Sequence, residues 1–199
     1  MRKLFAIFKY IKPICCYLLL CVFCKKTAFK DIGKWSEIIP VGLSGGGRIR
    51  YFTMYFKYFP EFRSEVYWRI GTPVSSILAF FASKHPTLYF DTPSKNVGNG
   101  LVIQHGHSTI IHANSIGEDC QIWQNVTIGK KVSGGKKPSI GNNVKIYAGA
   151  VVLGDIFIGD NVQIGANSVV VKNVPANCVV AGNPARIIRK DGERINEKL

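Results

Sequence analysis

The chain has 199 residues, 47% of them apolar, which suits one folded domain with a helical attachment and excludes wholesale disorder. Its formal net charge is +14, and residues 1–90 hold most of the excess, with 14 Lys and Arg against 4 Asp and Glu. Such a basic region attracts nucleic acid, anionic lipid or phosphorylated ligands. No zinc finger, helix-turn-helix or RNA-binding motif is visible, so a nucleic-acid partner is not expected.

An apolar run, ICCYLLLCVFC at residues 14–24, lies near the N-terminus between basic residues. The run is too short to span a bilayer as a helix, and a signal peptide would need a small-residue cleavage site where Cys24 is followed by two lysines. We expect residues 1–26 either to lie as a helix on the inner face of the membrane or to be buried at a subunit contact. The expected location is the cytoplasm, and the membrane alternative would place the protein peripherally on the inner face of the membrane.

The cysteines do not form a disulfide framework, because four lie in the apolar run and Cys120 and Cys178 are far apart. They are expected to act as small apolar residues in a reducing compartment. Downstream of the apolar run, helices are expected over residues 64–70 and 74–82, with prolines as breaks. Residues 1–90 are therefore predicted to form an N-terminal helical region.

A repeat of six residues organises the second half of the chain. The aliphatic series is Val97, Ile103, then after a slip of one residue Ile110, Ile116, Ile122, Ile128, and again in phase Ile140, Ile146, Val152, Ile158, Ile164 and Val170. An amphipathic helix would need apolar spacings of three and four, so each hexad is one short strand and one turn. Three hexads close a triangular coil, and about four coils fit between residues 97 and 174. Asn143 and Asn161 suit corners that need unusual backbone angles.

One segment, GKKVSGGKKPS at residues 129–139, has no inward aliphatic and contains a glycine pair and a proline. We expect it to project from the coil as a loop. It is either a solvated tether or a flap over a ligand on a neighbouring subunit, and loops on rigid scaffolds favour the flap.

Four segments resemble the hexapeptide-repeat acyltransferases, most of all their serine acetyltransferase branch: GNGLVIQH at 98–105, IWQNVTIG at 122–129, GGKKPSIGNNVKIYAGAVVLGDIFIGDNVQIGANSVV at 134–170, and VPANCVVAGNPARII at 174–188. This resemblance implies a left-handed parallel β-helix over residues 91–190, followed by a tail at 191–199. It also implies homotrimers whose sites, between subunits, move acetyl from acetyl-CoA to a hydroxyl. PEFRSEVYWRIG at 60–71 resembles the helical region of relatives attached to surface-polysaccharide synthesis.

The resemblance makes His105 the general base. A hydroxyl is a poor nucleophile, so an imidazole near its own pKa must take the proton as the oxygen attacks the thioester. The family's carboxylate that orients this base has no counterpart in register, and Asp91, one place away, is expected to substitute.

The acceptor site departs from the family pattern. Gln104 stands where a carboxylate is usual, and Lys136 and Lys137 replace an Arg and a His that hold the amino acid in serine acetyltransferases. We therefore expect a hydroxyl on a saccharide or polysaccharide precursor, with L-serine as the alternative. The expected acceptor-binding residues are Gln104, His107, Gln124, Asn125, Lys136 and Lys137.

Coenzyme A needs a groove for its narrow arm and cations for its phosphates. Small corner residues are expected to admit the arm, although they can also simply permit the turn. The expected cofactor-binding residues are Ala148, Gly149, Gly165, Ala166, Lys172, Arg186 and Arg189.

Two other classes of function remain open from the sequence. His107 and His112 resemble the paired metal ligands of γ-class carbonic anhydrases, which share the fold, but the only third histidine is His85, before the repeats. No metal is therefore expected. The second alternative is a β-helix without catalytic activity.

Overall fold

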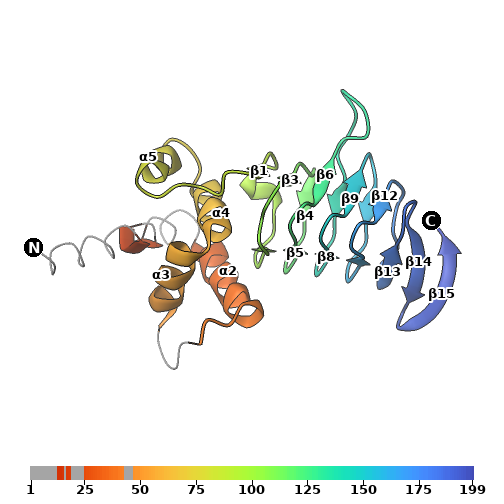
Figure 1. Ribbon diagram of the computed structural model, residues 1–199, viewed down its shortest axis with the longest axis horizontal. Coiled ribbons are helices and arrows are strands. Elements are labelled where there is room, and N and C mark those ends of the chain that lie inside the picture. Colours follow the sequence, from red (N-terminus) through yellow and green to blue (C-terminus); the bar gives the residue numbers. More distant parts are fainter. Residues whose placement is uncertain (1–12, 16, 19–24, 43–46) are drawn as a thin grey trace, which may run out of the picture. The chain divides into compact units, whose positions relative to one another are not determined.

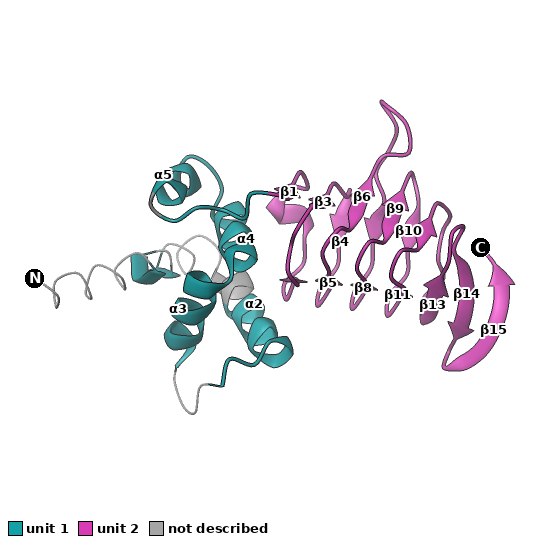
Figure 2. Ribbon diagram, in the orientation of Figure 1, with its two compact units in different colours: residues 1–86 teal, residues 87–199 magenta. Residues whose placement is uncertain are grey.

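The computed structural model describes residues 13–15, 17–18, 25–42 and 47–199, which form two compact units, residues 1–86 and 87–199 (Figures 1 and 2). The units divide four residues before the expected boundary at 90, because residues 88–90 already pair with the β-sheet of the second unit. Most of the apolar run at 14–24 lies outside the described residues, so its membrane contact stays a prediction. Among the helices that are described, none is long and apolar enough to cross a bilayer.

The first unit is helical, as predicted. It contains α2 (Lys25–Ile38), α3 (Arg48–Tyr58), α4 (Pro60–Ile70) and α5 (Val74–Phe81), and the last two correspond to the expected helices. Pro60 opens α4 at its first turn, where its missing N–H costs nothing. The core is aromatic: Trp35 packs edge-on against Phe62 with ring centroids 5.0 Å apart, and both side chains are buried.

A group of charged side chains is buried beside this aromatic core. Arg69 Nε lies 3.3 Å from Asp31 Oδ2, and Trp35 Nε1 donates a hydrogen bond of 3.1 Å to Glu65 Oε2. Burial, reinforced by the Asp31 carboxylate, raises the pKa of Glu65 well above its ordinary value. Glu65 is therefore the carboxyl group that stays protonated to higher pH than an exposed glutamate does.

The second unit is a coil of short strands on three faces (Figure 1). The first face is a five-stranded sheet: β1 (Leu88–Phe90), β3 (Thr109–Ile111), β6 (Thr127–Gly129), β9 (Val151–Leu153) and β12 (Val169–Val170). The second is a three-stranded sheet: β4 (Ser115–Ile116), β7 (Ser139–Ile140) and β10 (Phe157–Ile158). The third is a seven-stranded sheet, which contains β2 (Val102–Ile103), β5 (Gln121–Ile122), β8 (Lys145–Ile146), β11 (Gln163–Ile164), β13 (Cys178–Ala181), β14 (Arg186–Lys190) and β15 (Glu193–Lys198).

Parallel pairing stacks the aliphatic residues into inward ladders, as the period of six predicts. On the seven-stranded sheet the ladder runs Ile103, Ile122, Ile146, Ile164 and Val180, each at most 1% exposed. Cys120 and Cys178 are buried among these ladders, and burial raises the pKa of the Cys120 thiol to about 12. A short 3₁₀ turn, η1 (Ser94–Asn96), lies between β1 and β2 in the sequence.

One inward residue was assigned wrongly. Ile110 is 42% exposed, whereas Ile111 is 1% exposed and pairs with Ile128 in the ladder of the five-stranded sheet. The corner between β2 and β3 is the cause. Six residues, 104–109, separate the paired positions Ile103 and Ile110, whereas four, 123–126, separate their partners Ile122 and Thr127, so the inward position comes eight residues after Ile103 and one later than predicted. His105 and Ser108 have positive φ in this corner.

Asparagines stabilise another corner of the coil, as expected. Asn143, Asn161 and Asn177 all have φ between 53° and 59°, a region that asparagine tolerates. Asn143 Nδ2 donates to Asn161 Oδ1, and Asn161 Nδ2 donates to Asn177 Oδ1, both at 2.9 Å. The corners are thereby joined from rung to rung.

The C-terminal residues form a hairpin where a tail at 191–199 was expected. β14 and β15 pair antiparallel and extend the seven-stranded sheet beyond β13. Asp191 and Gly192, both with positive φ, make the two-residue turn. The sequence signal for this hairpin was the Asp191-Gly192 pair between two segments that each mix polar and apolar residues.

Candidate active site on two edges of the coil

The predicted site residues lie mainly along one edge of the coil, which we call the histidine edge. It consists of the corners between the seven-stranded and five-stranded sheets, residues 104–108, 123–126, 147–150 and 165–168, and of the connection 182–185 from β13 to β14, which is hydrogen-bonded to Val169 after the last of these corners. Backbone hydrogen bonds join these corners. The Asn125 N–H donates to the His107 carbonyl at 2.7 Å, and the Asn167 N–H donates to the Ala148 carbonyl at 2.9 Å.

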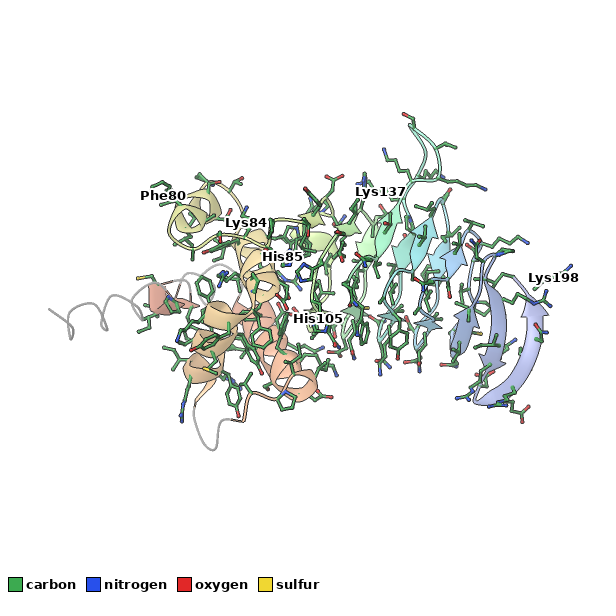
Figure 3. The ribbon with its side chains drawn as sticks, in the orientation of Figure 1. Phe80, Lys84, His85, His105, Lys137 and Lys198 are labelled. Atoms are coloured by element: carbon green, nitrogen blue, oxygen red, sulfur yellow. The ribbon has the colours of Figure 1, made fainter. Side chains whose placement is uncertain are left out.

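His105 stands at the first corner of the histidine edge. Its φ is 65° and its side chain is exposed, so the imidazole faces out of the coil and not into the dry interior (Figure 3). Gln104 and His107 belong to the same corner, and Gln124 and Asn125 to the next one. The amide oxygen of Gln124 is buried and accepts no hydrogen bond from the described residues.

Small residues follow along this edge, as expected. Gly149 has φ 72°, and a Cβ there would lie 2.1 Å from Asn167 Oδ1. Gly165 approaches Ala181 closely enough that a Cβ would lie 3.2 Å from the Ala181 Cβ. The backbone at Gly149 and Gly165 therefore has little room for a side chain, and the cofactor-binding role of Ala148, Gly149, Gly165 and Ala166 stays a prediction.

A pocket of about 490 Å³ lies at the C-terminal end of the coil, where residues 182–185 of the histidine edge approach Val171 and Lys172, which follow β12. Lys172 and Arg186, two predicted cofactor cations, line it together with Lys198 and Leu199, and Lys172 Nζ donates a hydrogen bond to the main-chain oxygen of Leu199. The corner residues 182–185 form one wall, and Val169 and Val171 another. Such a pocket can hold a polyanion beside an apolar surface.

Lys198 and Asn183, which also line this pocket, were not predicted. Lys198 reaches the pocket only because β15 folds back on β14, so the missed hairpin hid it. Arg189 was predicted with Arg186 but lies elsewhere, lining a separate hollow of about 460 Å³ with Gln163 and Asp191.

The other predicted residues lie on a different edge, which we call the loop edge. It consists of the segments that follow strands of the five-stranded sheet: residues 91–93, 112–114, 130–138, 154–156 and 171–173. Residues 130–138 project from the coil between β6 and β7, as predicted (Figure 1). Lys137 is carried on this loop, away from His105 (Figure 3).

Lys136 and Asp91 each have a carboxylate or imidazole partner on the loop edge. Lys136 Nζ lies 2.9 Å from Asp155 Oδ2, and this hydrogen bond raises the pKa of the ammonium above its ordinary value. Asp91 Oδ2 lies 3.0 Å from His112 Nδ1. Within one chain Asp91 thus pairs with His112 and not with His105, because the strands preceding Asp91 and His112 are neighbours in one sheet. Orientation of His105 by Asp91 would require the loop edge of another subunit.

The histidines that resemble metal ligands are not brought together. His107 belongs to the histidine edge and His112 to the loop edge, and His85 is buried in the helical unit, where its N–H donates to Ser64 Oγ. Across the described residues, no group of three or more His, Cys, Asp and Glu side chains is arranged to hold a metal ion.

Comparison with known proteins identifies the class of this coil. Residues 137–172 match the family model described as bacterial transferase hexapeptide (six repeats). The chain also superposes on two solved serine acetyltransferases, one from Neisseria gonorrhoeae in complex with serine and one in complex with CoA. The first has a TM-score of 0.63 and 28% identity over 83% of this chain and 69% of that one. The second has a TM-score of 0.63 and 26% identity over 82% and 68%. The predicted left-handed parallel β-helix with an N-terminal helical region is thereby confirmed.

Curated relatives point to the same proteins. The serine acetyltransferase of Synechococcus elongatus is 46% identical over 107 residues, which are 52% of this chain and 44% of the relative. That of Staphylococcus aureus is 44% identical over 108 residues, 53% of this chain and 51% of the relative. The chain thus spans about half the length of the curated relatives it matches.

Proposed function

We propose that the protein is an acetyl-CoA-dependent O-acetyltransferase in which His105 removes the proton of the acceptor hydroxyl. The observation that carries the proposal is the histidine edge itself. An exposed imidazole stands at one end, a cation-lined pocket at the other, and small corner residues lie between them. The solved relative in complex with CoA supports the choice of cofactor.

The chemistry follows from these groups. The His105 imidazole accepts the hydroxyl proton while the oxygen attacks the thioester carbonyl carbon. A carbon–oxygen bond forms, the carbon–sulfur bond breaks, and the proton passes from the imidazolium to the departing sulfur. No covalent intermediate on the protein is needed, and the buried Cys120 thiol, with its raised pKa, is not a nucleophile.

Replacement of the base tests the proposal. His105→Ala is expected to lower acetyl transfer by about two to four orders of magnitude while acetyl-CoA binding persists. Asn177→Ala is the matched control, since it also places alanine at an exposed position with positive φ (59°) but on neither proposed edge. Undiminished transfer in His105→Ala would remove this residue from its role.

We propose L-serine as the first acceptor to test. The relatives are named serine acetyltransferases, and one solved structure holds serine, so the comparisons favour the alternative acceptor over the saccharide expected from sequence. A saccharide hydroxyl remains the second candidate, because Gln104, Lys136 and Lys137 replace the groups that the resemblance assigns to an amino-acid acceptor. Transfer rates on serine and on a panel of sugars and nucleotide sugars distinguish the two.

We also propose a homotrimer in which the loop edge of one subunit meets the histidine edge of the next. The outer face of the five-stranded sheet supports this contact, because its paired residues Tyr89, Ile110, Thr127, Val151 and Val169 form an almost wholly apolar stripe. Tyr89 and Ile110 are 58% and 42% exposed in the single chain. The corresponding stripe on the seven-stranded sheet has polar residues at its centre, Gln121, Lys145 and Gln163, between Val102 and Val179.

A further inference from the structure

The helical unit has a surface that is nearly free of negative charge. Residues 1–90 contain only four acidic residues, and three of them, Asp31, Glu61 and Glu65, are at most 7% exposed. The fourth, Glu37, forms an ion pair of 3.3 Å with Lys34. Cations, in contrast, lie at the surface of α3 and beyond it: Arg48, Arg50 and Lys84 are exposed.

The outer side of α3 combines these cations with apolar side chains. It forms, with Ile14, a shallow groove of about 390 Å³, whose lining residues are Ile14, Ile49, Arg50, Thr53, Met54, Lys57 and Tyr58. Ile49 is 42% exposed and Tyr58 is 57% exposed. The spacing of three and four residues between Arg50, Met54, Lys57 and Tyr58 places them on one face of the helix.

The opposite face of α3 explains why these residues face outward. Phe52, Tyr55 and Phe56 are buried in the aromatic core of the helical unit, which fixes the rotation of the helix. The Lys57 ammonium lies 4.2 Å from the centroid of the Tyr58 ring, so the cation and the aromatic ring share one site on the surface.

We propose that this outer face of α3, together with Ile14, is a docking surface for an anionic lipid bilayer. Large apolar side chains among lysine and arginine, without carboxylates, match the boundary between acyl chains and negative headgroups. Tyrosine is favoured at that boundary because its ring is apolar and its hydroxyl is polar. Ile14, which lines this groove, is also the first residue of the apolar run in the sequence, and this supports a bilayer as the occupant over a protein. The inference is independent of acetyl transfer.

The test uses the full chain and two kinds of vesicle, neutral phosphatidylcholine and the same lipid with phosphatidylserine. Sedimentation with vesicles is expected only when phosphatidylserine is present, and is expected to weaken as salt shortens the Debye length from about 10 Å at 0.1 M to about 3 Å at 1 M. The double variant Arg50→Gln, Lys57→Gln is expected to bind about 25-fold more weakly, at about fivefold for each charge lost near the surface. The variant Ile49→Ser, which keeps both charges, is also expected to bind more weakly.

The matched control is Lys130→Gln, Lys131→Gln, which removes two charges from the projecting loop and is expected to bind as the wild type does. Equal losses in control and test variants would show that net charge alone drives binding and would overturn the proposal. Binding to neither vesicle would overturn it too. A lower molar mass of the α3 variant by light scattering without lipid would identify the face as a contact between copies of the chain, which also contradicts it. Unchanged thermal unfolding of each variant establishes that it is folded.

Discussion

Among single residues, the buried ionisable groups Asp31, Glu65 and Arg69 are those whose protonation depends most on their surroundings. Two carboxyl groups share one guanidinium in a region that excludes water, so only one carboxyl can stay charged at low cost. Burial makes Glu65 the group that holds a proton. The folded protein therefore binds this proton more tightly than the unfolded chain does.

This linkage gives a pH prediction. Because the pKa of Glu65 is raised in the folded state, the free energy of unfolding falls as the pH rises from the unfolded pKa toward the folded one. Glu65→Gln keeps an oxygen for the Trp35 N–H but removes the titration, so its Tm should exceed that of the wild type by more at pH 8 than at pH 5. Thermal unfolding by circular dichroism measures this, with Glu37→Gln on the exposed side of α2 as the control. An identical pH dependence in wild type and Glu65→Gln would contradict it.

At the scale of elements, the rungs of the coil are set by which aliphatic residue points inward after each corner. Two extra residues after Ile103, relative to the next rung, place the inward position at Ile111 and not at Ile110. This longer corner also presents His105 outward with positive φ. The irregular spacing between Ile103 and Ile111 and the candidate base His105 therefore belong to the same corner.

The two neighbouring isoleucines test this register directly. Ile111→Ala is expected to lower the free energy of unfolding by about 2–5 kcal/mol, since it leaves a cavity in the ladder. Ile110→Ala, one residue away on the outer face, is expected to cost less than about 1 kcal/mol in the isolated subunit. Urea unfolding measures both, and a larger loss for Ile110 would show that the register is the reverse.

At the scale of the whole molecule, His105 and the projecting loop 130–138 become parts of one site only if subunits associate. Within a chain, His105 and Lys137 follow strands of different sheets and belong to different edges. The apolar stripe on the five-stranded sheet is the surface that we propose for association, and a site shared between subunits would make activity depend on that association.

Disruption of the stripe tests this dependence. Val151→Lys places a charge in the middle of the stripe and is expected to convert trimers into monomers and to lower acetyl transfer with them. Light scattering coupled to size exclusion measures the mass. Gln163→Lys, on the outer face of the seven-stranded sheet, adds the same charge and is expected to stay trimeric. A trimeric, fully active Val151→Lys protein would place the interface elsewhere.

The sequence alone determined the coil, the helical region and the outward loop. A period of six with glycine and asparagine at the corners admits only short stacked strands, because each rung repeats the same inward ladder and the same turn. Resemblance directed attention to His105, and its exposed corner agrees with that assignment. The acceptor named by the relatives differs from the saccharide that Gln104, Lys136 and Lys137 suggested.

Only the tertiary structure decided which residues share an edge. Asp91 pairs with His112, Lys198 joins Lys172 and Arg186 at one pocket, and Ile111 replaces Ile110 in the core. Each of these outcomes depends on corner length or on the pairing of strands distant in sequence. The local sequence pattern gives neither of these. It specifies how often a strand recurs, but it does not specify which edge of the coil carries a residue that departs from the repeat.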